Sequence, residues 1–255
     1  MTANARDLAA FRNVDTWIFD LDNTLYPAES NLFAQVDRRM GEFIVNYLEV
    51  MPDEARRIQK HYYHTFGTTL AGLMKQHGVA PGDFLDYVHD IDLSPIEPAP
   101  DLAEAAKALP GKRYIFTNGS RRHAERVAEK LEVLHVFDGI FDIADSEYVP
   151  KPTRRAYDRA FEVFGADPRR AAMFEDLPHN LETPHALGMV TVLVHSSYAD
   201  HPAQKAVGPD RPLPPHVHHL TDDLTSFLKT LRPVVGPGGV DTAGRRGETD
   251  GETGT

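Results

Sequence analysis

The 255-residue chain contains no cysteine. This absence excludes disulfide bridges, zinc sites with thiolate ligands and cysteine nucleophiles. The chain also has little positive charge: 27 lysines and arginines stand against 38 aspartates and glutamates, which gives a formal net charge of -11. Nucleic-acid polymers are usually bound by a basic surface, so we expect no nucleic-acid partner. A small phosphorylated metabolite held in a locally positive pocket is compatible with this charge.

Long apolar runs are also missing. The first residues, MTANARDLAAF, do not form the apolar segment of a signal peptide, and no later stretch is long enough to span a bilayer. We therefore expect a cytoplasmic protein without a membrane partner. The hydrophobic content of 41% and the charged content of 25% are ordinary for a globular protein. The length suits one large domain or a core domain with a smaller insert.

Strand-like and helix-like segments alternate over most of the chain. Short runs of β-branched and aromatic residues predict strands at residues 15–21, 112–118, 139–144, 170–176 and 189–195. Amphipathic spacing predicts helices at residues 102–109, 121–131, 153–165 and 179–188. This order is typical of an α/β fold in which helices cover both faces of a parallel sheet. We therefore predict a Rossmann-like, doubly wound sheet.

A different pattern interrupts this order after the first strand. Four amphipathic helices are predicted at residues 32–48, 52–66, 68–78 and 80–90. We therefore divide the chain into an α/β core of residues 1–26 and 99–232 and an all-helical insert of residues 27–98. Within the core, residues 196–219 are predicted to be a long loop and residues 221–231 a final helix. The glycine-rich residues 233–255 predict a disordered tail.

Two aspartates, Asp20 and Asp22, follow the first predicted strand in the sequence WIFDLDNTLYP. Side chains two residues apart on an extended chain point in the same direction, so both carboxylates can face one ligand. Ligands of an open parallel sheet bind beyond the carboxyl ends of its strands. The two aspartates are therefore expected at a binding site.

The next strand is predicted to end at the same edge of the sheet. It ends in IFTNGS, where Thr117, Asn118 and Gly119 precede a helix. A hydroxyl group, an amide and backbone N–H groups at the start of a helix can bind an anion. This turn is therefore a candidate phosphate site.

Lys151, Glu175 and Asp176 complete the predicted site, because each follows a strand or precedes a helix at that edge. Four carboxylates that lie close together raise one another's pKa unless positive charge compensates them. A hard divalent cation with oxygen ligands provides this compensation, and magnesium binds through one or two carboxylates and a substrate phosphate. We therefore predict a Mg²⁺ site and a phosphoryl substrate.

These motifs resemble those of a known superfamily. DLDNT, FTNGS, the lysine of PKP and FED with a following asparagine occur in the order of the four motifs of the haloacid dehalogenase superfamily, over about residues 15–195. The helical insert looks like the C1-type cap of that superfamily. FDLDNTLYP, GTTLAGLM, FTNGS and FEDLPHNL are most similar to its pyrimidine 5′-nucleotidase group. The resemblance implies a phosphatase that converts pyrimidine nucleoside 5′-monophosphates, UMP or CMP, to nucleoside and phosphate.

The resemblance also implies roles for the site residues. Asp20 would attack phosphorus and form an aspartyl-phosphate, while Asp22 would protonate the leaving oxygen and then activate water. The phosphoryl group would be bound by Thr117, Asn118, Gly119 and Lys151. Magnesium would be held by Asp20, the backbone carbonyl of Asp22, Asp176 and, directly or through water, Glu175. The insert would close over the substrate.

Other functions remain open from the sequence. The same four motifs serve phosphatases of other small metabolites, such as a sugar phosphate, phosphoglycolate, FMN or NMN, and phosphomutases. His61, His64 and the pair His89 and Asp90 lie on predicted helices and suggest a helical metal-dependent phosphohydrolase instead. A binding module without turnover is a third class. For a nucleobase, the insert offers five aromatic candidates: Phe33, Tyr47, Tyr62, Tyr63 and Phe66.

Overall fold

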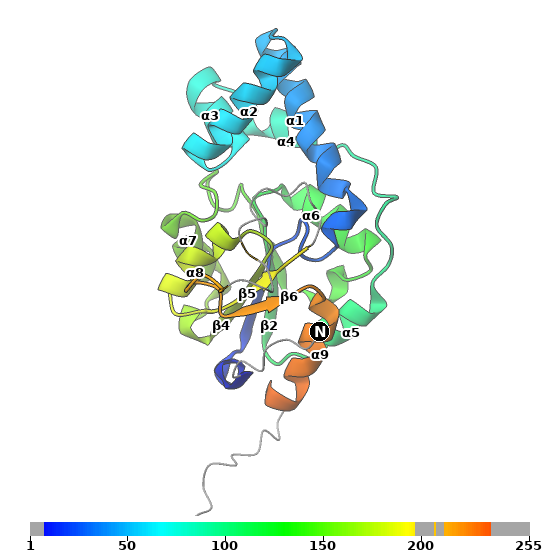
Figure 1. Ribbon diagram of the computed structural model, residues 1–255, viewed down its shortest axis with the longest axis vertical. Coiled ribbons are helices and arrows are strands. Elements are labelled where there is room, and N and C mark those ends of the chain that lie inside the picture. Colours follow the sequence, from blue (N-terminus) through cyan, green and yellow to red (C-terminus); the bar gives the residue numbers. More distant parts are fainter. Residues whose placement is uncertain (1–7, 197–206, 208–211, 236–255) are drawn as a thin grey trace, which may run out of the picture.

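The computed structural model describes residues 8–196, 207 and 212–235. Within this part of the chain, six parallel strands form one sheet in the order β3-β2-β1-β4-β5-β6 (Figure 1). The strands are β1 (Thr16–Phe19), β2 (Lys112–Phe116), β3 (Gly139–Phe141), β4 (Ala171–Glu175), β5 (Val190–Val194) and β6 (His219–Thr221). The strand order reverses direction between β1 and β4. The predicted α/β, Rossmann-like sheet is therefore confirmed.

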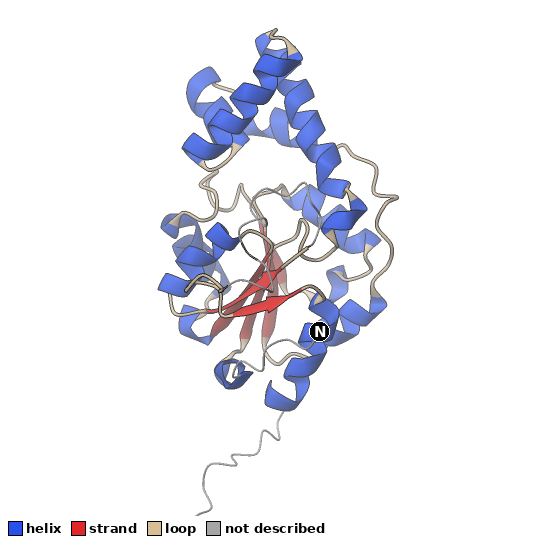
Figure 2. Ribbon diagram, in the orientation of Figure 1, coloured by secondary structure: helices blue, strands red, loops and turns tan. Residues whose placement is uncertain are grey.

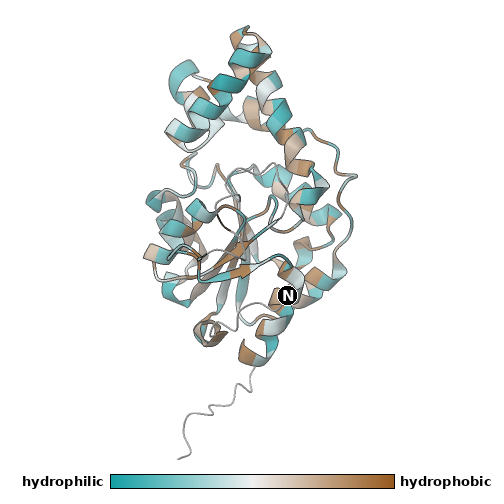
Figure 3. Ribbon diagram, viewed as in Figure 1, coloured by the Kyte–Doolittle hydropathy of each residue, from teal (hydrophilic) through white to brown (hydrophobic). Residues whose placement is uncertain are grey.

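Helices cover both faces of this sheet (Figure 2). They are α5 (Pro100–Lys107), α6 (Arg121–Lys130), α7 (Arg154–Phe164), α8 (Glu182–Ala186) and α9 (Leu224–Val235). The buried residues of α5, α6 and α9 belong to one hydrophobic cluster, whereas those of α7 belong to another. Side chains alternate between the two faces of a strand, so Trp17 and Phe19 of β1 enter the first cluster and Ile18 enters the second. Brown, hydrophobic segments accordingly lie within the sheet in Figure 3, while the outer helices mix both colours.

Four further helices lie together beyond one end of the sheet (Figures 1 and 2). They are α1 (Leu32–Leu48), α2 (Pro52–Phe66), α3 (Thr69–His77) and α4 (Pro81–Val88), and we call them the helical insert. Proline at the first position of α2 and of α4, and glycine after α2 and α3, begin and end these helices where the sequence predicts. Phe43 of α1 packs edge-to-face on Phe84 of α4, with ring centroids 5.1 Å apart. The insert therefore has hydrophobic packing of its own.

Three predicted boundaries near the end of the chain were wrong. The predicted loop of residues 196–219 ends in β6, which pairs with β5 through Val192 and His219. The final helix begins at Leu224 rather than residue 221, because Thr221 belongs to β6 and Oδ1 of Asp223 caps the helix by accepting the N–H of Ser226 at 2.9 Å. This helix continues to Val235, so residues 233–235 are helical and not part of a disordered tail. The remainder of the predicted tail, 236–255, lies outside the described residues.

No helix in the described ranges is both long and apolar enough to cross a bilayer.

Candidate active site

The turn after β1 places Asp20 and Asp22 at the carboxyl end of the sheet. The N–H of Asp20 donates to the carbonyl of Phe174 at 2.9 Å, so pairing with β4 continues to this residue. The chain then turns, and Asn23 adopts a left-handed conformation with φ of 59°. The two carboxylates consequently reach different neighbours although they are two residues apart.

Lys151 is the centre of one side of the site, and only 2% of its surface is exposed. Its ammonium group donates to Asp20 Oδ1 at 2.6 Å, to Glu175 Oε2 at 2.7 Å and to the carbonyl of Phe116 at 2.9 Å. Burial alone would lower the pKa of Lys151, but the negative charges of Asp20 and Glu175 raise it overall. Lys151 is therefore a cation that fixes the orientation of Asp20.

Asp20, Glu175 and Asp176 form a buried acidic cluster, in which one carboxylate oxygen of each residue lies within 4.8 Å of the others. Burial, followed by the charge of Glu175, raises the pKa of Asp20 and of Asp176 above the ordinary value. Burial also opposes ionisation of Glu175, but the charge of Lys151 lowers the pKa of Glu175 overall. One lysine thus faces three carboxyl groups, so full ionisation would leave an excess of negative charge that protons or a further cation must balance.

This acidic cluster fits a hard divalent cation. Its three side chains offer oxygen atoms, which are the ligands that magnesium prefers, and its excess negative charge is of the matching sign. Glu175 uses Oε2 for Lys151 and accepts the N–H of Leu177 with Oε1 at 3.2 Å. Both carboxylate oxygens of Glu175 are therefore engaged within the protein.

Asp22 lies in different surroundings. Its Oδ1 accepts hydrogen bonds from the hydroxyl group of Tyr26 at 2.6 Å and from Nε2 of His123 at 2.9 Å. Burial alone would raise the pKa of Asp22, but the charge and hydrogen bond of His123 and the hydrogen bond of Tyr26 lower it overall. Asp22 is therefore a stable carboxylate beside the acidic cluster.

The turn after β2 brings the predicted phosphate-binding residues to the same edge. Thr117 is buried, and its Oγ1 accepts the N–H of Gly119 at 2.9 Å. Oδ1 of Asn118 accepts the backbone N–H of Lys151 at 2.9 Å, and Nδ2 of Asn118 donates to the carbonyl of Lys151 at 3.4 Å. Asn118 thus ties the loop that carries Lys151 to the turn after β2.

Two histidines join this site that sequence reasoning did not place there. His123 lies in the first turn of α6, three residues after its N-cap Ser120, and His89 is the C-cap of α4 in the insert. Their rings stack with centroids 4.3 Å apart and planes 10° apart, and we call them the ring pair. The place of His123 could have been inferred, because its helix starts at the FTNGS turn. The place of His89 could not have been inferred, since His89 belongs to a helix that is distant in the sequence.

The insert also reaches the acidic cluster, through Tyr63 of α2. The ring of Tyr63 lies edge-to-face against His179 with centroids 6.5 Å apart. Burial, followed by the charges of Asp176 and Glu175, raises the pKa of Tyr63 to about 12. Of the five aromatic candidates, Tyr63 thus contacts His179 of the core, whereas Tyr62 is buried within the insert.

The alternative metal site on helices is not assembled. His61 is exposed and contacts Thr65 one turn away, whereas Nδ1 of the buried His89 contacts Oγ of Ser120 at 2.9 Å. Among the residues that the structure describes, only the acidic cluster brings three potential ligands close enough for one ion.

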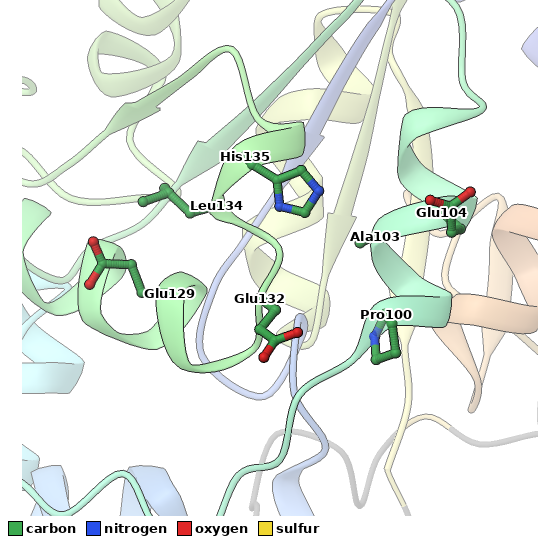
Figure 4. Close-up of a pocket in the computed structure, with 7 residues that line it drawn as sticks. All are labelled: Pro100, Ala103, Glu104, Glu129, Glu132, Leu134 and His135. Atoms are coloured by element: carbon green, nitrogen blue, oxygen red, sulfur yellow. The ribbon is translucent and has the colours of Figure 1, made fainter.

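Two cavities lie near or on the core. One of about 550 Å³ is bordered by α5 and the segment after α6 and contains none of the predicted site residues (Figure 4). Its lining residues are Pro100, Ala103, Glu104, Glu129, Glu132, Leu134 and His135. The other, of about 250 Å³, lies between the insert and α6 and is lined in part by Arg39, His89, Ser120 and His123. The second cavity therefore adjoins the site from the side of Asp22.

Comparison with known proteins gives a match to a family model. Residues 14–188 match the model of haloacid dehalogenase-like hydrolases. Phosphate metabolism protein 8 of Saccharomyces cerevisiae is 29% identical over 195 residues, which are 69% of this chain and 60% of the yeast protein. The chain thus spans less than two thirds of the length of that relative.

Two solved structures are similar in fold. A HAD phosphatase from Thermococcus onnurineus is 17% identical with a TM-score of 0.55, and the match covers 86% of this chain and 98% of that one. L-2-haloacid dehalogenase from Xanthobacter autotrophicus is 16% identical with a TM-score of 0.53 and the same coverage of 86% and 98%. The fold is therefore shared by proteins whose names describe two different reactions.

Proposed function

The chain belongs to the haloacid dehalogenase-like hydrolases, and from this premise we propose that it is a magnesium-dependent phosphomonoester hydrolase. Asp22 is the observation that carries this proposal. A carboxylate at this position can protonate the alkoxide that leaves a phosphate ester, whereas a leaving halide needs no proton. The name of the yeast relative, which refers to phosphate metabolism, agrees with this choice.

In the first step, a carboxylate oxygen of Asp20 attacks phosphorus and forms an aspartyl-phosphate, while the bond from phosphorus to the leaving oxygen breaks. Lys151 holds Asp20 in place at 2.6 Å, and its positive charge stabilises the negative charge of the transferring group. The turn of Thr117 and Gly119 supplies further polar groups for the phosphoryl oxygens. Asn118 supports these groups indirectly, by holding the loop of Lys151.

Asp22 transfers the proton in both steps. Tyr26 and His123 lower its pKa at rest, whereas the approach of an anionic phosphate raises this pKa because like charges disfavour each other, so that Asp22 takes up a proton from solvent. Asp22 then gives a proton to the leaving alkoxide. In the second step it takes a proton from the water that attacks the aspartyl-phosphate, and the bond to Asp20 breaks.

Magnesium would be held by Asp20, Asp176 and the backbone carbonyl of Asp22, with Glu175 contributing directly or through water. When bound, the ion neutralises the acidic cluster and the phosphate and so favours attack by one anion on another. Tyr63 and the ring pair lie where the insert meets the core.

We further propose that residues 27–98 act as a cap on the core of residues 1–26 and 99–232 and select the substrate. The proposed substrate is a pyrimidine nucleoside 5′-monophosphate, on the resemblance of FDLDNTLYP and FEDLPHNL to that group of phosphatases. We propose that Tyr63, whose ring contacts His179 of the core, is the aromatic side chain of the insert that packs on the base.

Phosphate release from a panel of nucleotides, sugar phosphates, phosphoglycolate and FMN tests this function. Wild type and Asp20→Asn are compared with magnesium and with a chelator. We expect magnesium-dependent release, fastest with UMP and CMP, and none from Asp20→Asn. Release from other phosphates alone would reject the nucleotide substrate but keep the chemistry. Release from none of them would reject the hydrolase and favour a phosphomutase or a binding module.

A further inference from the structure

His123 keeps a buried polar atom unsatisfied. Only 1% of its surface is exposed, and its Nδ1 has no hydrogen-bond partner within the described part of the protein. A buried group left in this state costs about 1–3 kcal/mol. The stability of α6 therefore does not explain a histidine at this position, and its other nitrogen, Nε2, is the atom with a contact.

Nε2 of His123 restrains the carboxylate of Asp22. An ionised carboxylate can only accept hydrogen bonds, so both Nε2 of His123 at 2.9 Å and the hydroxyl group of Tyr26 at 2.6 Å donate to it. Both donors use Oδ1. Two donors on one oxygen fix the rotation of the carboxylate, and Oδ2 is the oxygen left to exchange a proton with the substrate.

His89 in turn restrains the ring of His123. It stacks on that ring at 4.3 Å, and Ser120, which caps α6, contacts Nδ1 of His89 at 2.9 Å. Arg126 donates to the carbonyl of His89 at 2.9 Å and so anchors the end of α4 to α6. A path of contacts therefore runs from the insert through both rings to Asp22.

We propose that His123 is the positioning residue of Asp22, and that His89 of the insert holds the His123 ring in the orientation this requires. This proposal rests on the proposed function for its kinetic consequence but not for its geometry. Proton transfer to the leaving group then depends on the insert being seated on α6. His123 itself does not touch the reacting atoms.

Leaving groups of different basicity provide the kinetic test. The alcohol released in the first turnover is measured with UMP, whose alkoxide needs a proton, and with p-nitrophenyl phosphate, whose phenoxide leaves without one. For His123→Phe we expect first-turnover release of uridine to fall about 100-fold and that of p-nitrophenol by less than about threefold, with KM little changed. His123→Gln, whose amide can still donate, should recover much of the loss.

The controls separate positioning from folding. His61→Gln changes an exposed histidine of the insert and should match wild type with both substrates. His89→Ala should show a smaller loss in the release of uridine than His123→Phe. His89→Phe, which keeps a ring to stack on His123, should show a smaller loss still. Equal losses with both substrates, or a change in KM alone, would show that His123 has no specific effect on Asp22.

A second readout does not depend on activity. In ¹⁵N-labelled protein, the Nε2–H proton of His123 should give a protected resonance that is absent in His123→Gln. This resonance should shift in Asp22→Asn and stay unchanged in His61→Gln. If Asp22→Asn left it in place, the proposal would be wrong even for an active phosphatase. If the shift occurred in a protein that hydrolysed no phosphate, the proposed function would fail while the contact from His123 to Asp22 stood.

Discussion

Asp20 and Asp22 are two residues apart, yet they belong to two regions with opposite electrostatics. Asp20 lies in the acidic cluster, where burial and the charge of Glu175 raise its pKa. Asp22 lies against Tyr26 and His123, which lower its pKa overall. The same residue type thus meets excess negative charge on one side of the turn and hydrogen-bond donors on the other.

This difference shows how one turn can supply two chemical roles. The cluster around Asp20 has too much negative charge on its own and is suited to a cation and to a nucleophile that the cation and Lys151 hold. The surroundings of Asp22 are complete within the protein and suited to a group that gains and loses a proton. Surroundings that make the pKa values of two titratable groups differ are a common basis for giving the groups different catalytic roles.

The largest effect is expected on the acidic side, from Asp20→Asn. This change keeps the shape of the side chain but removes the nucleophile, so kcat should fall roughly 10⁴-fold or more with every phosphate ester. Phosphate release measures it, and the aspartyl-phosphate should no longer be trapped by acid quenching. A residual rate within tenfold of wild type would remove Asp20 from this role.

Magnesium should stabilise the acidic side without any substrate. At about 100 times its Kd, an ion that binds only the folded state adds about 2.7 kcal/mol, or roughly 5–10 °C in Tm for a protein of this size. Asp176→Asn should lose most of this shift, because the change removes a ligand. Without magnesium the variant should melt no lower than wild type, since it relieves repulsion among three buried carboxylates. Thermal denaturation with and without magnesium checks both statements, and Glu29→Gln, which changes an exposed carboxylate outside the cluster, is the control.

The surroundings of Asp22 should respond to acid through His89. Burial, followed by the charge of His123, lowers the pKa of His89 from 6.5 to about 3. Arg126 also lowers this pKa, whereas Asp22 raises it. Because His89 resists protonation in the folded state, its contribution to the free energy of unfolding is complete above pH 6.5 and declines as the pH falls towards 3. At pH 5 the free energy of unfolding should therefore be lower by about 2 kcal/mol.

Urea denaturation at pH 8 and pH 5 measures this loss. His89→Gln has no titrating ring and should lose less stability between these pH values than wild type, while His61→Gln should follow wild type. Parallel losses in all three proteins would assign the acid sensitivity elsewhere.

The smallest effect is expected from Tyr26→Phe. It removes one of the two donors on Oδ1 of Asp22 while His123 keeps the other at 2.9 Å. We expect a loss of about 1 kcal/mol in transition-state stabilisation, or roughly fivefold in kcat. A steady-state rate with UMP checks this value. A loss larger than that of His123→Phe would make Tyr26, not His123, the main support of Asp22.

Much of the fold could be predicted because its signals are local. The helices α1 and α2 begin and end at the predicted residues, since amphipathic spacing, proline at a first turn and glycine after a last turn are properties of neighbouring residues. β6 was missed because its three residues, His219 to Thr221, include only one apolar side chain, and it forms through pairing of His219 with Val192. The predicted residues Asp20, Lys151, Glu175 and Asp176 do meet, since parallel strands end at one edge.

The sequence by itself determined the order of elements, the edge at which the motifs gather and the type of chemistry that four carboxylates and a lysine suggest. Only the tertiary structure decided that the two aspartates differ. The contact from Asp22 to His123 spans 101 positions, and the stacking of His89 on His123 joins the insert to α6. Such contacts depend on how whole helices pack, so no local period or turn signal contains them. The charges that surround each aspartate, and hence its pKa, are set by that packing.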